Sequence, residues 1–257
     1  MGKLKGQTVF ITGASSGIGL ACARSFAVEG ARLLIAARRL DRLTALAPEL
    51  RQLGAADTHA VSLDVQNRSE VQQRIDDLPG EWRDIDILIN NAGLSRGLDK
   101  LYEGNIEDWE EMIDTNVKGL LYVTRAVVPG MVKRGRGHVV NLGSTAGHLT
   151  YPNGAVYCAS KAAERVITEG LREDVLGTPI RVTTVDPGMV ETEFSEVRFR
   201  GDAERAAKVY ENLTPLRAED VADAIMFAVT RPAHVNIAEI LLTPVDQANS
   251  LLFNRRN

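Results

Sequence analysis

Cysteine is scarce in this 257-residue chain, and so are signals for export or lipidation. Cys22 and Cys158 lie far apart in dissimilar contexts, which argues against a disulfide framework. The first residues lead straight into a short strand pattern without an export signal, and Gly6 stands where a myristoylation signal needs Ser or Thr. We therefore expect a reduced, cytoplasmic setting.

Long apolar runs and blocks of one charge are missing as well. No stretch approaches the roughly 20 apolar residues needed to span a bilayer. A formal net charge of -4 with mixed signs indicates neither a nucleic-acid partner nor an anionic membrane surface. The histidines are scattered along the chain, so the sequence predicts no metal site. With nucleic acid, membrane and metal not indicated, we expect a small molecule as the partner.

What the chain does contain is a regular alternation of short apolar, β-branched runs and helical patterns. Strands are predicted at 7–12, 32–37, 58–63, 85–89, 138–142, 180–185 and 237–242. The longer helices are predicted at about 68–78, 106–133, 154–175, 203–211 and 219–230. With no linker and no repeat, this order predicts one α/β domain, 1–257, with a Rossmann-type, doubly wound, seven-stranded parallel sheet and helices on both faces. The looser stretch at about 190–215 is a candidate substrate lid.

A glycine-rich turn joins the first predicted strand to the first helix. It consists of Gly13, Ala14, Ser15, Ser16, Gly17, Ile18 and Gly19. Glycines let a backbone approach a pyrophosphate closely, and a helix N-terminus supplies free N–H groups. The spacing differs from the commoner Gly-x-Gly-x-x-Gly, and a purely structural turn is the alternative. The strand before it and the helix after it favour a nucleotide site.

Two arginines follow the second predicted strand, where the adenosine ribose of a bound dinucleotide would lie. An acidic residue there is typical of NAD, whereas arginine accommodates the 2′-phosphate of NADP. Arg38 and Arg39 therefore predict NADP(H), with Ser15 as a second phosphate contact. Asp41, the first acid after them, has the position of a helix cap. The alternative is that both arginines only solvate the end of the strand.

Polar residues also follow the third and fourth predicted strands. Asp64 and Val65 come after the third, where Asp64 is a candidate adenine acceptor, with an N-cap or ion-pair role as the alternative. The fourth runs into Asn91, Ala92 and Gly93, which suggest a backbone turn beside the cofactor.

Tyr157 and Lys161 lie four residues apart in a predicted helix, so they share one helix face. A free phenol with a pKa of about 10 exchanges protons poorly near neutrality. A neighbouring ammonium favours the phenolate, which makes Tyr157 a candidate general acid/base. Ser144 follows the preceding strand, and Asn116 lies well inside the helix predicted at 106–133. Taken alone, the tyrosine and lysine could equally be a packing residue and a surface residue.

In sequence order, these motifs resemble the short-chain dehydrogenase/reductases over essentially the whole chain. The resemblance rests on the turn from Thr12 to Gly19, Asn90 to Gly93, Ser144, Tyr157-x-x-x-Lys161 and Pro187-Gly188. It implies that Asn116, Ser144, Tyr157 and Lys161 form the catalytic tetrad. Ser144 would bind the substrate oxygen, Tyr157 would exchange its proton, and Lys161 would hold the nicotinamide ribose. Asn116 would anchor a water that links Lys161 to solvent.

The same resemblance implies a nicotinamide clamp. Its residues are Pro187, Gly188, Val190 and Thr192. It also implies a homotetramer or homodimer, because the family pairs long helices and C-terminal segments.

A finer resemblance, carried by stretches such as 194–199 and 232–237, is to the NADP-dependent 3-hydroxy acid dehydrogenases, which oxidise serine, allo-threonine and similar acids, 3-hydroxypropionate among them. Thr243-Pro244-Val245-Asp246-Gln247 replaces the Val-Asp-Gly-Gly ending of the 3-oxoacyl carrier-protein reductases. A short acid needs a cation for its carboxylate. The candidates are Arg198 and Arg200 in the lid and Arg96.

Two other functions stay open. One is a broad carbonyl or ketone reductase that uses the same tetrad, and the other is a nucleotide-sensing protein without turnover. The complete tetrad argues against the sensor, since a sensor has no need of these four groups together.

Overall fold

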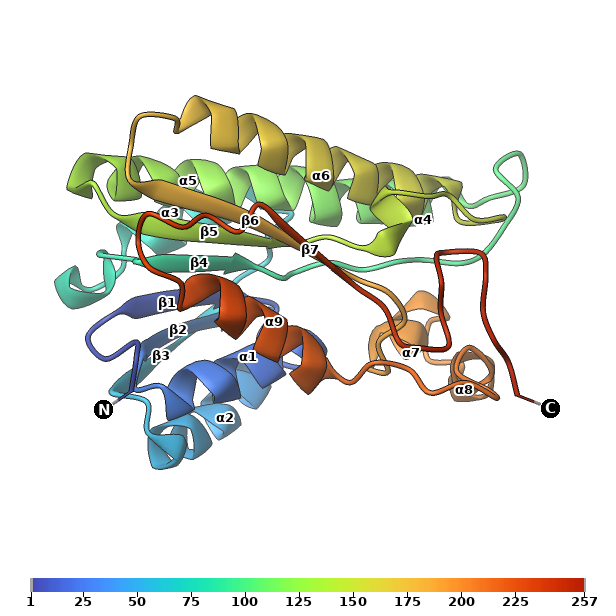
Figure 1. Ribbon diagram of the computed structural model, residues 1–257, viewed down its shortest axis with the longest axis horizontal. Coiled ribbons are helices and arrows are strands. Elements are labelled where there is room, and N and C mark those ends of the chain that lie inside the picture. The colour runs from blue at the N-terminus through green and yellow to red at the C-terminus, as the bar shows by residue number, and fades with distance from the viewer. Residues whose placement is uncertain (1, 257) are drawn as a thin grey trace.

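Seven parallel strands form one central sheet in the computed structural model, which describes residues 2–256 (Figure 1). Their order across the sheet is β3-β2-β1-β4-β5-β6-β7. The strands are β1 Thr8–Thr12, β2 Arg32–Ala37, β3 Asp57–Ser62, β4 Ile87–Asn90, β5 Gly137–Leu142, β6 Ile180–Pro187 and β7 Glu239–Leu242. The order reverses between β1 and β4, so a crevice for a ligand lies at their carboxyl ends. The predicted fold class is confirmed.

Helices cover both faces of the sheet (Figure 1). One face carries α1 Gly17–Val28, α2 Leu40–Leu53 and α9 Ala218–Val229. The other carries α3 Arg68–Asp76, α4 Ile106–Ile113, α5 Leu120–Arg134 and α6 Ala155–Asp174. Two short helices, α7 Phe194–Arg198 and α8 Ala203–Lys208, lie apart from both layers, towards the end of the molecule to which β6 and β7 run.

The alternation of side chains along the strands produces two cores, one on each face. In β1, Phe10 packs with Leu88 and Met131 under α5, whereas Ile11 packs with Phe26 and Ile225 under α1 and α9. All six of these side chains are essentially inaccessible to solvent. Because both faces are covered, the strands are continuous apolar runs rather than alternating ones.

The helix predicted at 106–133 is interrupted. A π-helical segment, Asp114–Gly119, separates α4 from α5 and contains Asn116. Such segments insert an extra residue into a helix and occur frequently at functional sites. The apolar pattern of the sequence could not reveal the interruption, because both flanking helices keep their buried face.

Three other boundaries differ from the predictions. Helix α7 was not predicted, since its five residues are too few to show a periodic pattern. Asp41 is not a cap: Arg39 occupies the N-cap of α2 and Asp41 lies in its first turn. Strand β7 starts at Glu239 rather than at 237, because the side chain of Asn236 takes the ladder position, accepting from Val182 N at 2.8 Å and donating to Val182 O.

Among residues 2–256, no helix has both the length and the apolar character that a bilayer crossing requires.

Candidate active site

A cavity of about 340 Å³ opens at the carboxyl ends of the strands, between the sheet and the segment that carries α7. Every residue predicted to contact the cofactor lines it except Gly19. Ser144 lines it as well, whereas Asn116 does not. The cavity therefore brings together groups from the first to the last third of the chain.

The glycine turn forms the floor of this cavity at the start of α1. Gly13 has φ +67°, a conformation that residues with a side chain rarely adopt. Gly19 acts by close packing instead, because a Cβ there would lie 2.4 Å from Gly13 O. No side chain caps α1. Its first N–H groups are therefore available to an anion, as a pyrophosphate site requires.

Arg39 lies over the same turn. Its Nη2 donates to Ser15 Oγ at 3.1 Å and to Ser16 Oγ at 2.9 Å, while its Nη1 pairs with Glu193 at 3.0 Å. Arg38 is exposed and also lines the cavity. Two guanidinium groups and two hydroxyls thus surround the position predicted for the 2′-phosphate, and these residues fit NADP. The sequence analysis missed Glu193, which comes from the segment before α7, 154 residues away.

The adenine side of the cavity is built by the loops after β3 and β4. Asp64 Oδ1 accepts from Gln66 N at 3.1 Å, so its carboxylate shapes the turn as well as lining the cavity. Asn91 Nδ2 donates to Thr12 O and Gly13 O, at 2.9 and 3.1 Å, which joins this loop to the glycine turn. Gln66 was not predicted, yet it lines the cavity beside Asp64 and Val65.

Ser144, Tyr157 and Lys161 meet on the other side of the cavity. Ser144 stands at the N-cap of a short 3-10 helix, Thr145–Gly147, where its Oγ accepts from Ala146 N at 3.1 Å. Tyr157 and Lys161 lie one turn apart in α6 and are both buried. The Tyr157 ring packs against Phe194 of α7 at a centroid distance of 5.7 Å.

Lys161 is held from two directions by the protein. Its Nζ donates to Leu142 O at 2.8 Å and lies 2.6 Å from Glu164 Oε2. Burial is the largest single effect on the pKa of Lys161 and would lower it, but the charges of Glu164, Tyr157 and Asp186 together outweigh burial, and the pKa is raised. Burial also raises the pKa of Glu164, to about 7, against the opposing effect of Lys161. The sequence analysis missed Glu164, although its spacing of three residues places it beside Lys161 on the helix.

Asn116 lies next to these groups but points away from the cavity. Its Oδ1 accepts from Leu94 N at 2.9 Å, and its Nδ2 donates to Leu94 O and Ser160 Oγ at 2.8 and 3.0 Å. A Cβ at Gly93 would lie 3.3 Å from Asn116 Oδ1 and 3.6 Å from Lys161 Nζ. The side chain thus fixes the loop after Gly93, and the water predicted at Asn116 stays a prediction.

The predicted nicotinamide clamp rests on the C-terminal segment. Gln247 Oε1 accepts from Met189 N at 2.8 Å, and a Cβ at Gly188 would lie 2.1 Å from the same oxygen. Gln247 belongs to the sequence that departs from the carrier-protein reductase pattern. Its side chain is buried beneath Pro187 to Val190, so a residue that departs from the reductase pattern supports this loop.

The three candidate arginines have different surroundings. Arg96 makes a two-point contact with Glu111, at 2.6 and 2.8 Å, and Arg200 pairs with Asp108. Arg198 has no carboxylate partner in the described part of the chain. Its guanidinium lies over the rings of Tyr157 and Phe194, 5.2 Å from each centroid, and its Nη2 donates to Tyr151 O–H at 2.9 Å.

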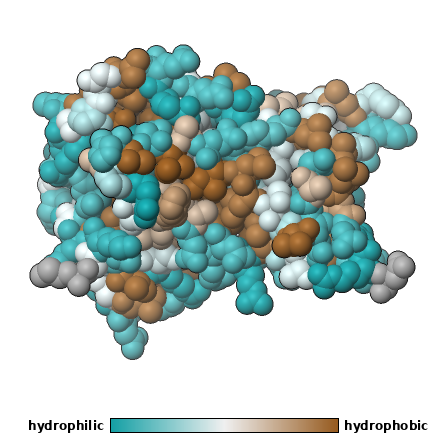
Figure 2. All heavy atoms as spheres, in the orientation of Figure 1, coloured by the Kyte–Doolittle hydropathy of each residue, from teal (hydrophilic) through white to brown (hydrophobic). Residues whose placement is uncertain are grey.

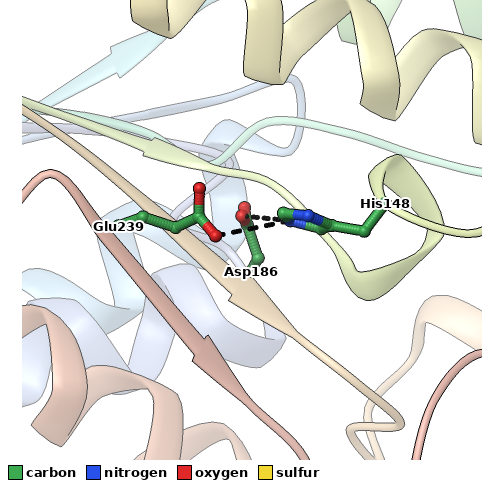
Figure 3. Close-up of side chains that lie close together, drawn as sticks. All are labelled: His148, Asp186 and Glu239. Carbon is green, nitrogen blue, oxygen red and sulfur yellow. Dashed lines mark hydrogen bonds and ion pairs between the residues drawn. The ribbon is translucent and has the colours of Figure 1, made fainter.

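Three further titratable side chains, His148, Asp186 and Glu239, lie close together (Figure 3). His148 Nε2 lies 2.7 Å from Asp186 Oδ2 and 3.9 Å from Glu239 Oε1. Their ligand-type atoms all lie within 4.8 Å of one another. Asp186 also accepts from Thr184 Oγ1 at 2.6 Å, and a Cβ at Gly143 would collide with it. The protein itself therefore pairs the buried carboxylate. The cluster combines three elements far apart in sequence, which no local spacing could reveal.

Comparison with known proteins finds relatives over most of the chain. Residues 7–203 match the short chain dehydrogenase family. The chain is 49% identical over 241 residues to the NADP-dependent 3-hydroxy acid dehydrogenase of Salmonella typhi, covering 93% of this chain and 96% of the relative. It is 47% identical to sulfoacetaldehyde reductase 2 of Chromohalobacter salexigens, covering 93% and 95%.

Among solved structures, the closed form of a serine dehydrogenase complexed with NADP+ superposes with a TM-score of 0.92 at 45% identity, covering 98% of this chain and 100% of the other. The NADP dependence of these proteins agrees with the cofactor predicted from Arg38 and Arg39.

Proposed function

Because the chain belongs to the short chain dehydrogenase family, we propose that it interconverts a short 3-hydroxy acid and its 3-oxo product, with NADP(H) as cofactor. Serine, allo-threonine and 3-hydroxypropionate are the acids in question. The observation that carries the choice of an acid is Arg198, a cation without a carboxylate partner that lies against Tyr157. The relatives named for 3-hydroxy acids and serine support the same choice.

The chemistry follows from groups that line one cavity or lie next to it. NADP+, when bound, supplies the hydride acceptor. Ser144 binds the substrate oxygen, and Tyr157 takes the hydroxyl proton in oxidation or returns it in reduction. Lys161 favours the phenolate and holds the nicotinamide ribose, while Asn116 anchors the loop beside them. Pro187 to Val190 and Thr192 clamp the nicotinamide, and Gly19 keeps the glycine turn tightly packed.

Arg198 suits the carboxylate of such a substrate for two reasons. A planar guanidinium binds a carboxylate through two parallel hydrogen bonds, and aromatic faces hold it in a fixed plane. Its Nε is buried and makes no hydrogen bond within residues 2–256, and Arg198 itself does not line the cavity, so a substrate carboxylate would reach this donor through a shift of α7. Arg96 and Arg200 already neutralise Glu111 and Asp108, and binding a substrate would require those pairs to break.

Arg198 lies at the end of α7, within the segment of about 190–215 that we propose as a substrate lid. Glu193 contacts Arg39 over the glycine turn, and Phe194 contacts Tyr157. The same short segment thus touches both the cofactor side and the substrate side of the cavity. Closing it over a bound acid would exclude water from the reacting atoms.

A second candidate is the reduction of a short anionic aldehyde. The relative named sulfoacetaldehyde reductase 2 favours it. A sulfonate presents oxygens to a guanidinium as a carboxylate does, so Arg198 would serve either substrate. A carbonyl reductase without an anionic substrate would give Arg198 no such partner.

The test is the steady-state oxidation of L-serine, allo-threonine and 3-hydroxypropionate, followed by NADP+ reduction at 340 nm, in the wild type and in Arg198→Met. Losing a charged hydrogen-bond partner costs roughly 1.5–3 kcal/mol. KM for the acids should therefore rise about 10- to 100-fold, with a far smaller change for an uncharged alcohol of similar size. Sulfoacetaldehyde reduction in the same assay separates the two candidates.

Arg200→Met is the matched control, because this neighbouring lid arginine pairs with Asp108 instead. We expect it to change KM for the acids about twofold at most. Equal effects of Arg198→Met on acids and uncharged alcohols would refute carboxylate binding, and a wild type that oxidises none of the acids would refute the proposed substrate class.

The cytoplasmic setting and the homotetramer or homodimer also remain proposals. Figure 2 shows apolar surface gathered over β7 and the adjoining part of α9, where Leu241 and Phe227 are half exposed. Val245, just after β7, is fully exposed. Burying this surface against another copy of the chain would remove it from water, and the molar mass in solution tests this.

A further inference from the structure

We propose that Glu164 is a positioning residue of this dehydrogenase: it accepts, from Lys161, the proton that oxidation of the alcohol releases at Tyr157. The proposal concerns the family's proton transfer, and it rests on the proposed function only for the choice of alcohol.

The contact between the two side chains is close and shielded from water. Glu164 is 2% exposed and Lys161 6%, and Glu164 Oε2 has no partner in the described residues other than Lys161 Nζ at 2.6 Å. An ammonium has three donors. One is taken by Leu142 O, and a second faces Glu164 Oε2 in an ion pair rather than a hydrogen bond. The third is left for the cavity that Lys161 lines.

Burying the Glu164 carboxylate costs free energy, so its presence at this position calls for a functional explanation. Replacing a buried ion pair by apolar residues is often neutral or stabilising, so such a pair is weak evidence for a role in stability. The proton affinity of this pair is suited to exchange instead. Burial raises the pKa of Glu164 to about 7, so the carboxylate takes up a proton near neutral pH. Lys161 keeps its own proton across that range, because its pKa is raised.

The other titratable groups that face the pair come from α6, β6 and the loop after Ser144. Tyr157 acts on Lys161 from the same helix, and the charge of Asp186 acts on both members of the pair. His148, 28% exposed, pairs with Asp186, and Glu239 reaches the surface beside it (Figure 3).

The proton balance is simple. In oxidation the alcohol carbon loses a hydride to NADP+, and its hydroxyl proton goes to the Tyr157 phenolate. Tyr157 becomes a phenolate again by giving its proton to Lys161, while Lys161 gives one of its own protons to Glu164. Lys161 stays cationic and Glu164 becomes a neutral acid until the products leave, when Lys161, which lines the cavity, carries the proton back to the water that enters. Glu164 must be ionised at the start, so oxidation should slow when it is protonated.

The test compares pH profiles of kcat from pH 5.5 to 9.5 in the wild type, Glu164→Gln and Glu169→Gln, with the alcohol that the wild type oxidises fastest. Glu169→Gln is the matched control, since Glu169 lies on the same helix, is 47% exposed and pairs with Arg165. The wild type and this control should show a fall in kcat with an apparent pKa near 7. Glu164→Gln should lack that ionisation. Its kcat at pH 8 should fall about tenfold, less than the roughly hundredfold loss of a direct general base.

Two further readouts separate proton transfer from folding. KM for NADP+ should stay within about twofold of the wild type, and the variant should remain folded at the assay temperature, although losing one partner of a buried ion pair lowers the midpoint of its thermal unfolding. If Glu164→Gln does not fold, Glu164→Asp, which keeps a carboxylate, should retain the ionisation at a lower kcat. Profiles of identical shape in the wild type and Glu164→Gln, or an Asp variant without the ionisation, would overturn the proposal. Because the fastest alcohol is used, failure with serine affects only the proposed substrate.

Discussion

Arg39 should decide the preference for NADP over NAD, and the size of its effect can be worked from its contacts. A hydrogen bond to a charged group contributes roughly 1.5–3 kcal/mol. Arg39 must first leave Glu193, but that pair is 41% and 40% exposed. Pairs with such exposure contribute only about 0–1 kcal/mol. Taking the middle of each range, the difference leaves about 1–2 kcal/mol for a 2′-phosphate, which corresponds to roughly 5- to 30-fold in affinity.

Arg39→Gln should therefore raise KM for NADP+ roughly 5- to 30-fold and leave KM for NAD+ within about twofold. The Ser15 and Ser16 hydroxyls remain in this variant, so some phosphate binding should persist. The assay is paired steady-state kinetics with NADP+ and NAD+ at one saturating alcohol concentration and fixed ionic strength, since an exposed phosphate contact is screened by salt.

Arg42→Gln is the control for this experiment. Arg42 also pairs with Glu193, at 2.7 Å, but it does not line the cavity. Burial raises the pKa of Glu193, while hydrogen bonds from Arg42 and Arg39 lower it further than burial raises it. Losing Arg42 should leave the ratio of the two KM values unchanged. An equal rise for both cofactors in Arg39→Gln, or no rise for NADP+, would refute the role assigned to Arg39.

Two other predictions concern the phenol and a buried histidine. Tyr157→Phe should lower kcat by about 10²- to 10⁴-fold with little change in NADP+ affinity, measured by cofactor fluorescence; a smaller loss would exclude Tyr157 as the acid/base. Burial lowers the pKa of His138 to about 3, so the folded state resists a proton that the unfolded chain accepts near 6.5. The stability that comes from keeping His138 neutral is complete above pH 6.5 and is lost as the pH falls towards 3. Between pH 7 and 5, the free energy of unfolding, measured by urea titration, should therefore fall by about 2 kcal/mol more in the wild type than in His138→Gln. Equal losses would contradict this.

The proton-accepting role of Glu164 also bears on Asn116. The side chain of Asn116 is fully engaged by Leu94 and Ser160, so it holds the loop rather than facing the cavity. A π-helical segment around it leaves its backbone as the part able to hold a water. The predicted route through a water at Asn116 and the proposed route through Glu164 lie on different elements. A variant of Glu164 alone can therefore show how much of the proton transfer each route carries.

The sequence by itself determined the fold class and most of the cavity lining. Gly13 to Gly19, Arg38 with Arg39, and Tyr157 with Lys161 each lie within one junction or one helix. Local spacing places such residues, because a strand end or a helix turn fixes where neighbouring side chains point. The parallel order of the strands then brings those junctions to one edge of the sheet.

Only the tertiary structure decided which charged groups are paired. Arg96, Arg198 and Arg200 were equivalent candidates in the sequence, and long-range contacts with Glu111 and Asp108 leave Arg198 as the one without a carboxylate. The burial of Glu164 likewise depends on what packs over α6. Ionisation and pairing depend on desolvation and on charges brought from distant elements, and neither is encoded in the spacing of neighbouring residues.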